Sequence, residues 1–140
     1  MIGITGMAHV GIRVSDFGKA VRFYQLLGFK VTRNDQEERV IVLNHPDGIV
    51  INLLDSADHD NDGRNVLMDE AVQYAGLTHL AMSVENVYMA INSVRNLGIM
   101  ITEGPVTFGD GSTSIFFRDP DRNVIELSQP AQVANDEVQR

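Results

Sequence analysis

The strongest constraint on the fold of this 140-residue chain is that its first half recurs, in altered form, in its second half. Gly6-Met-Ala-His9 returns as Gly76-Leu-Thr-His79, and the end of each half matches as well, with Asn52 opposite Glu126. A duplicated unit this small cannot bury its apolar face alone, so the two copies should pack together about a pseudo-two-fold axis. Such an axis would gather four polar residues around one centre: His9, Asn52, His79 and Glu126.

Each half is predicted to fold as a βαβββ unit. In the first half, residues 8–14 alternate apolar and polar side chains as a half-buried strand does. Residues 17–27 then follow helical spacing, after Ser15-Asp16 as candidate caps and before Gly28 as a stop. Strands are expected at 29–33, 40–44 and 49–54, with Asp47-Gly48 as a hairpin turn.

The second half repeats this order and completes an α+β fold. We expect a strand at 77–84, a helix at 87–97 that ends at Gly98, and strands at 99–102, 114–118 and 124–128. Repeat 1 would cover residues 1–55 and repeat 2 residues 76–130, together forming one domain. An acidic connection at 56–75, with a short helical turn near 66–74, would join them, and 131–140 would be a polar tail.

Composition excludes several classes of function and partner. The chain has no cysteine, so it forms no disulfide or thiolate metal site. Its net charge of −8 opposes binding to nucleic acid or anionic membranes, which are bound through Lys and Arg. Met1 leads into the first strand without a basic segment or a long apolar run, so we expect no signal peptide and no membrane span. A cytoplasmic protein that acts on a small molecule is predicted.

Strand alternation places the repeated histidines on faces that can bind a metal ion. His9 shares its face with Gly11 and Arg13, and His79 shares its face with Ala81 and Ser83, while the large aliphatic side chains point the other way. Glu126 lies on an apolar strand, where an unpaired carboxylate would be expensive to bury. A divalent cation held by His9, His79 and Glu126 would remove that cost. Two imidazoles and one carboxylate suit Fe, Mn, Ni, Co or Zn and leave positions for water and substrate.

Other candidate ligands are set aside at this point. Residues 58–69 imitate an EF-hand loop, but Asp69 replaces the bidentate Glu and a strand, not a helix, precedes the loop. His45 and His59 have no partner in register. We therefore expect a solvated acidic connection and no cation site there.

Four segments resemble the vicinal oxygen chelate superfamily, which includes glyoxalase I, bleomycin resistance proteins and extradiol dioxygenases. They begin at His9, Phe23, Gly76 and Phe117, the last running Phe-Arg-Asp-Pro-Asp-Arg-Asn-Val-Ile-Glu-Leu. The resemblance covers nearly the whole chain and is nearest to short bacterial glyoxalase I-like proteins. It implies two βαβββ modules that form a curved, partly open sheet around one divalent metal per chain. It also implies a homodimer.

Within this resemblance the metal positions fall on His9, position 52, His79 and Glu126. Arg13 matches the position where glyoxalases bind a glutathione carboxylate, so it is the expected substrate anchor. Asn52 departs from the pattern, since a glyoxalase supplies a second glutamate there. An amide binds metal weakly and cannot act as a base, so Asn52 is expected to contact substrate and Glu126 is left as the catalytic base.

Three functions follow from these residues. The first is a divalent-metal-dependent glyoxalase-like lyase or isomerase that acts on a small oxygen-chelating substrate. The second is an Fe(II) extradiol-type dioxygenase on a catecholic substrate, which Asn52 favours because it leaves coordination sites free. The third is a drug-binding or resistance protein without catalysis, against which the intact His9, His79 and Glu126 argue.

Overall fold

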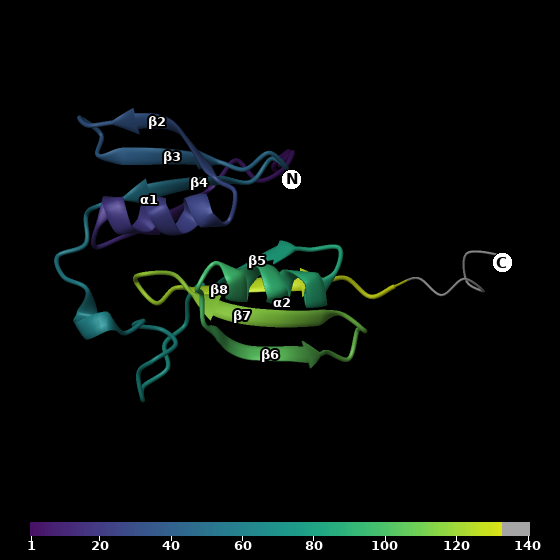
Figure 1. Ribbon diagram of the computed structural model, residues 1–140. Coiled ribbons are helices and arrows are strands. Elements are labelled where there is room, and N and C mark those ends of the chain that lie inside the picture. The colour runs from purple at the N-terminus through teal and green to yellow at the C-terminus, as the bar shows by residue number, and fades with distance from the viewer. Residues whose placement is uncertain (133–140) are drawn as a thin grey trace. The chain divides into compact units, whose positions relative to one another are not determined.

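The computed structural model describes residues 1–132 and divides the chain into two compact units, Met1–Val66 and Leu67–Arg140 (Figure 1). The boundary falls inside the predicted acidic connection. Residues 133–140 of the predicted tail lie outside the described residues. That both repeats form one domain, residues 1–130, stays a prediction.

The first unit contains one βαβββ module. Its elements are β1 (Val10–Arg13), α1 (Phe17–Leu26), β2 (Lys30–Asp35), β3 (Val40–Asn44) and β4 (Val50–Leu54). They form a four-stranded sheet in the order β1-β4-β3-β2, in which β1 runs parallel to β4 and the other pairs are antiparallel. A short 3-10 turn, η1 (Asn61–Gly63), follows the module.

The second unit has the same element order and the same sheet topology. It comprises β5 (His79–Ser83), α2 (Val87–Asn96), β6 (Ile101–Thr107), β7 (Thr113–Arg118) and β8 (Val124–Gln129), in the sheet order β5-β8-β7-β6. The predicted α+β class and the two βαβββ modules are confirmed. Each sheet is open, because its two outer strands do not pair with each other.

Both helices are preceded by a capping side chain, and for α1 it is Asp16, one of the two predicted candidates. The Asp16 carboxylate accepts a hydrogen bond from the backbone N–H of Lys19 at 2.9 Å. Asn86 caps α2 in the same way, accepting from the N–H groups of Tyr88 and Met89. Each helix ends just before a glycine with positive φ, Gly28 or Gly98, which leaves the helix through a conformation that favours glycine.

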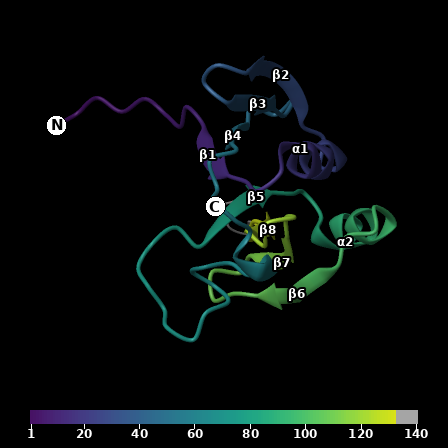
Figure 2. The ribbon, with the colours of Figure 1, turned by 90° about the vertical axis from the view of Figure 1, so that its left-hand side faces the viewer.

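Each helix covers one face of its own sheet and leaves the other face without a helix (Figures 1 and 2). Helix α1 packs on β2, β3 and β4, and α2 packs on β6, β7 and β8. The side chains between helix and sheet form two cores. The first contains Val14, Ala20, Tyr24, Phe29, Ile41, Leu43, Ile51 and Leu53; the second contains Val87, Ile91, Val94, Ile115, Phe117 and Ile125.

Two predicted elements differ from the structure by more than a shift of one or two residues at an end. Strand β6 extends to Thr107, well beyond the expected end at residue 102, and its pairing with β7 shifts at two irregularities. Pro105 lies in this strand, where its missing N–H is tolerated because β6 is the outer strand of the sheet. The helical turn expected near 66–74 is replaced by turns and bends, and the short helical turn is η1 instead.

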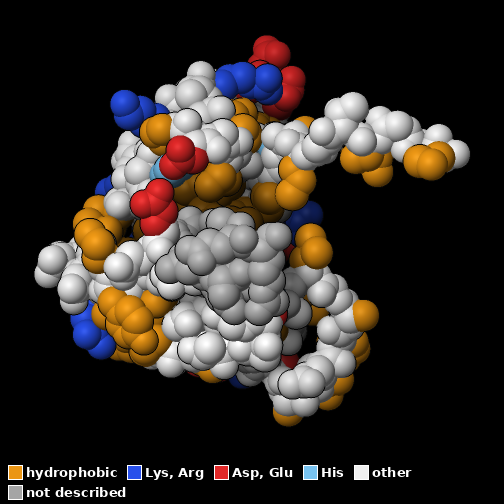
Figure 3. All heavy atoms as spheres, turned by 90° about the vertical axis from the view of Figure 1, so that its right-hand side faces the viewer, with side chains coloured by type: hydrophobic (Ala, Val, Ile, Leu, Met, Phe, Trp, Pro, Cys, Tyr) orange, Lys and Arg blue, Asp and Glu red, His pale blue; other side chains and the backbone are white. Residues whose placement is uncertain are grey.

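The side chains on the outside include many apolar ones. Met1, Ile2, Ile4 and Met7 are all exposed along the segment that leads to the N-terminus, which Figure 3 shows projecting with its hydrophobic side chains in orange. Among the described residues, no helix has the length and apolar character needed to cross a bilayer.

Candidate functional site

The second sheet brings together two of the three predicted metal ligands. Ala81 of β5 pairs with Glu126 of β8, and His79 lies two residues before Ala81, so His79 and Glu126 share one face of adjacent strands. The His79 Nε2 and Glu126 Oε1 atoms are 3.1 Å apart. Helix α2 covers the opposite face, where Ile125 is fully buried. The pair therefore lies on the helix-free face, as strand alternation predicts.

The Glu126 carboxylate is mostly enclosed, with 13% of its side chain exposed. Its second oxygen, Oε2, accepts a hydrogen bond from the Ser114 hydroxyl at 2.7 Å. Ser114 is fully buried in β7, so this bond is shielded from water. The Ser114 hydroxyl offsets part of the cost of burying the carboxylate, and the second oxygen faces the imidazole of His79.

The His79 ring is held from its other side by a hydroxyl as well. Thr78 Oγ1 lies 2.8 Å from His79 Nδ1. When Nδ1 carries the ring proton and donates it to Thr78, the Nε2 lone pair is free to bind a cation. Phe116 packs against the same ring, with the two ring centroids 6.4 Å apart.

The first sheet places His9 and Asn52 at the corresponding positions. Gly11 pairs with Asn52 as Ala81 pairs with Glu126, and His9 lies two residues before Gly11. His9 is exposed and lies one residue before β1, because that strand begins at Val10 and not at the predicted residue 8. Asn52 is half-buried in β4.

Arg13 lies on the exposed side of β1, two residues after Gly11. Its Nε donates a hydrogen bond to the Ser56 hydroxyl at 3.1 Å, which ties the side chain to the chain segment just after β4. A guanidinium in this position can bind a carboxylate or phosphate through its remaining N–H groups. That Arg13 anchors an anionic part of a substrate stays a prediction.

The fit of a metal to these residues can be judged within each unit. In the second unit, an imidazole and a carboxylate converge on one point, and each has a hydroxyl that orients it, as metal ligands in proteins do. Within residues 1–132, neither unit alone brings three histidine or carboxylate side chains close enough together to hold a metal ion. His79 and Glu126 fit a divalent cation as part of its ligand set, and further ligands must come from elsewhere.

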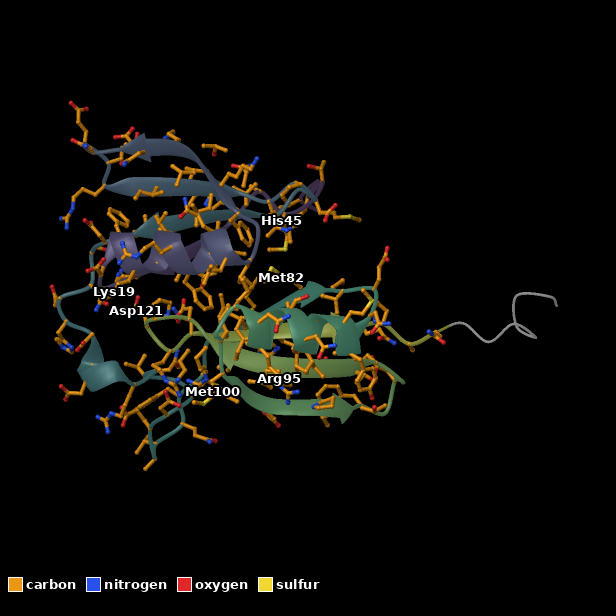
Figure 4. The ribbon with its side chains drawn as sticks, in the orientation of Figure 1. Lys19, His45, Met82, Arg95, Met100 and Asp121 are labelled. Atoms are coloured by element: carbon orange, nitrogen blue, oxygen red, sulfur yellow. The ribbon has the colours of Figure 1, made fainter. Side chains whose placement is uncertain are left out.

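The side chains set aside in the sequence have structural roles. His45, which follows β3 directly, packs on Phe29, and its Nδ1 accepts the backbone N–H of Asp47 (Figure 4). His59 Nδ1 accepts the N–H of Asn61. Asp69 forms a two-point ion pair with Arg118, with both contacts at 3.0 Å. The acidic connection is therefore held to the second unit through a carboxylate that an EF-hand would use for calcium.

Arg122 lies in the turn between β7 and β8. Its φ of 68° is in the left-handed region, which few residues other than glycine adopt readily. Its carbonyl oxygen accepts a hydrogen bond from Arg118 at 2.8 Å, which supports the turn. In the same turn the buried Asp119 carboxylate accepts the N–H groups of Asp121 and Asn123.

Sequence reasoning missed Ser114 and Thr78, which contact the two predicted ligands of the second repeat. Alignment of the two repeats is enough to single out Thr78. Thr78 stands where the first repeat has Ala8, so the hydroxyl is present beside only one of the two histidines. Ser114 could not be found this way before the pairing of β7 with β8 was known.

Comparison with known proteins identifies one superfamily. Residues 6–127 match the family model of the Glyoxalase/Bleomycin resistance protein/Dioxygenase superfamily. A lactoylglutathione lyase from Haemophilus influenzae is 30% identical over 127 residues, which span 85% of this chain and 88% of the relative. A probable lactoylglutathione lyase from Vibrio cholerae is 27% identical over 136 residues, spanning 89% and 90%.

A solved structure supports the same fold. The bleomycin resistance determinant encoded on transposon Tn5 superposes with a TM-score of 0.67 at 18% identity, covering 91% of this chain and all of that chain. This likeness concerns the fold alone. The match of the family model to residues 6–127, most of the sequence, shows that the chain belongs to the glyoxalase/bleomycin resistance protein/dioxygenase superfamily.

Proposed function

We propose that this protein is a divalent-metal-dependent enzyme of the glyoxalase type, a lyase or isomerase that acts on a small substrate with two adjacent oxygen atoms. The observation that carries the proposal is the convergence of His79 Nε2 and Glu126 Oε1, 3.1 Å apart, on the helix-free face of the second sheet. Relatives named lactoylglutathione lyase support this reaction class over most of the chain.

In this proposal the metal ligands are His79, Glu126 and His9. Superfamily members commonly use a divalent metal, and the ligand types suit Fe, Ni, Zn, Co or Mn. When bound, such an ion supplies a Lewis acid for the two substrate oxygens. His9 holds the position in the first repeat that His79 holds in the second, which supports its assignment as the third ligand.

Proton transfer and substrate binding are assigned to three side chains: Glu126, Arg13 and Asn52. Glu126 accepts a proton from the substrate carbon at a carboxylate oxygen and returns it, since Asn52 at the equivalent position cannot act as a base. Arg13 binds an anionic part of the substrate through its guanidinium. Asn52 offers its amide as a hydrogen-bond donor or acceptor to the bound substrate.

Asn52 is the specific observation that favours a second candidate, an Fe(II) extradiol-type dioxygenase. Two histidines and one carboxylate are the ligand set that such oxygenases use, and an amide at position 52 does not add a second carboxylate to it. The structural likeness to a bleomycin resistance determinant keeps a non-catalytic binder as a third outcome.

One experiment separates these functions. The purified protein is analysed for metals, then stripped and reloaded with iron, nickel or zinc and assayed for hemithioacetal turnover and for oxygen uptake with a catechol. Turnover of the hemithioacetal with nickel or zinc supports the proposal. Oxygen uptake with iron selects the dioxygenase. Tight drug binding with neither activity selects the binder.

A further inference from the structure

The two repeats differ in the hydroxyl groups that surround their candidate ligands. In the second repeat, Ser114 stands two residues before Phe116, the residue that pairs with Glu126. In the first repeat, Val42 pairs with Asn52, and the residue two positions earlier is Val40. The hydroxyl beside the carboxylate is therefore absent from the first repeat, as is the one beside the histidine, where Ala8 replaces Thr78.

Ser114 restricts how Glu126 can bind a cation. A serine hydroxyl has one proton to donate, and here the Oγ atom lies 2.7 Å from Glu126 Oε2. This bond uses one lone pair of Oε2, while Oε1 faces His79 Nε2. Because Ser114 is fully buried, no water competes easily for the hydrogen bond. The carboxylate is thus prepared to bind through one oxygen and not through both.

Thr78 restricts His79 in a corresponding way. Its hydroxyl oxygen, 2.8 Å from Nδ1, can accept the ring proton there. That arrangement places the proton on Nδ1 and turns the Nε2 lone pair toward the Glu126 side of the ring. Removing a group that orients a ligand in this manner typically lowers metal affinity or activity by about 10- to 100-fold.

We propose that Ser114 and Thr78 are positioning residues for the metal centre, which make the second repeat its primary binding half and hold Glu126 as a one-oxygen ligand. This inference rests on the proposed function, because it presumes that His79 and Glu126 bind a divalent ion. It adds two residues to the candidate site, and it assigns the larger share of the metal affinity to the second repeat.

The test uses Co²⁺ as a spectroscopic probe with the full-length protein. Cobalt is titrated into the wild type, Ser114→Ala and Thr78→Val, and both the dissociation constant and the visible absorption spectrum of the bound ion are recorded. We expect each substitution to weaken binding by about tenfold or more. Ser114→Ala should also change the spectrum, since Glu126 is then free to bind through both oxygens.

Control variants separate positioning from general damage to the fold. Ser128 pairs directly with Ser114 across the sheet, so Ser128→Ala removes a neighbouring hydroxyl that is not bonded to Glu126 and should leave binding and spectrum unchanged. Thr78→Ser and Ser114→Thr keep the hydroxyl and should restore most of the affinity. Because Thr78 is exposed, Thr78→Ser should fold even if the extra methyl of Ser114→Thr does not fit.

The possible outcomes distinguish the two proposals. A wild type that binds no cobalt would remove the proposed metal function and this inference with it. A wild type that binds cobalt, with Ser114→Ala and Thr78→Val retaining its affinity and spectrum, would overturn the positioning role alone.

Discussion

At the scale of single residues, the asymmetry between Glu126 and Asn52 distinguishes this chain from a glyoxalase with two carboxylates. Glu126 is bonded to Ser114 and faces His79, whereas Asn52 stands opposite Val42 in β3 and Gly11 in β1. The two repeats therefore share one sheet topology, whereas the carboxylate and the hydroxyl bonded to it are present in the second repeat only.

This asymmetry predicts the effect of restoring the missing carboxylate. Asn52→Glu should tighten divalent metal binding, because it adds a charged ligand at the position that a glyoxalase uses, and it should raise a low wild-type hemithioacetal activity. Calorimetric titration with nickel and a turnover assay measure the two effects, and Asn52→Gln serves as a control that adds length without charge. Robust glyoxalase turnover by the wild type, or unchanged affinity in Asn52→Glu, would show that position 52 does not determine the chemistry.

Residue-level reasoning from sequence succeeded where it depended on alternation along one strand. The shared face of His79 and Glu126 follows from the period of two within β5 and β8. Ser114 could not be predicted, because its contact with Glu126 is a diagonal one between β7 and β8. Such a contact depends on the register of two strands, and a slip of one residue would turn the hydroxyl to the other face.

At the scale of elements, β6 contains a position, Gly104, where the backbone has little room for a side chain. Gly104 has a φ of 94°, and a Cβ placed on it would lie 2.5 Å from the carbonyl oxygen of Ser114. We expect Gly104→Ala to destabilise the protein by about 1 to 3 kcal/mol through backbone strain and this contact. It should also weaken metal binding, because the contacted backbone belongs to the residue that positions Glu126.

Gly109→Ala is the matched control for this prediction. Gly109 lies shortly after β6, its φ is not in the left-handed region, and a Cβ added to it would meet no atom within 4 Å. Denaturant unfolding of both variants gives the comparison. Equal stability of Gly104→Ala and the wild type would contradict the assigned strain.

The helix caps predict a specific dependence of stability on pH. The backbone N–H of Lys19 donates to the Asp16 carboxylate and lowers the pKa of Asp16. A lowered pKa in the folded state means that the cap stabilises the fold above the unfolded pKa, near 4, and that this contribution is lost as pH falls through the folded value. Asp16→Asn keeps a capping oxygen that does not titrate, as Asn86 does at α2.

Thermal unfolding followed by circular dichroism measures this effect. Between neutral pH and about pH 3, the melting temperature of the wild type should fall further than that of Asp16→Asn. The lowered pKa of Asp110, caused mainly by the Ser112 hydroxyl, contributes equally to both proteins and cancels in the comparison. Parallel curves would mean that the Asp16 carboxylate gives no more stabilisation than an amide.

Sequence reasoning is most accurate for elements with local signals. Both helices begin at the predicted residues, 17 and 87, because their caps and glycine stops lie next to the apolar pattern. The prediction for β6 is too short, because the two irregularities in its pairing with β7 interrupt the alternation of apolar and polar side chains along the strand. The turn η1 cannot be predicted from the spacing of apolar residues, because it depends on positive φ angles at Asn61 and Asp62.

At the scale of the whole molecule, the exposed apolar side chains favour association between copies of the chain. Large apolar residues are exposed in the N-terminal segment of the first unit and at Tyr74, Leu77 and Met100 of the second. Exposed apolar surface on this scale commonly marks an interaction site, and pairs with two-fold symmetry are the commonest assembly. We therefore expect a homodimer, with light scattering at micromolar concentration giving the mass of two chains; the mass of one chain would contradict this prediction.

The central claim is that His9, His79 and Glu126 together bind one divalent ion per chain, and calorimetric metal titration tests it most directly. Wild-type protein should bind one nickel or cobalt ion per chain, and His9→Ala or His79→Ala should each lower the affinity by about tenfold or more. His59→Ala, which removes an exposed histidine of the acidic connection, should have no effect. Full occupancy with unchanged affinity in the His9→Ala/His79→Ala double variant would contradict the claim.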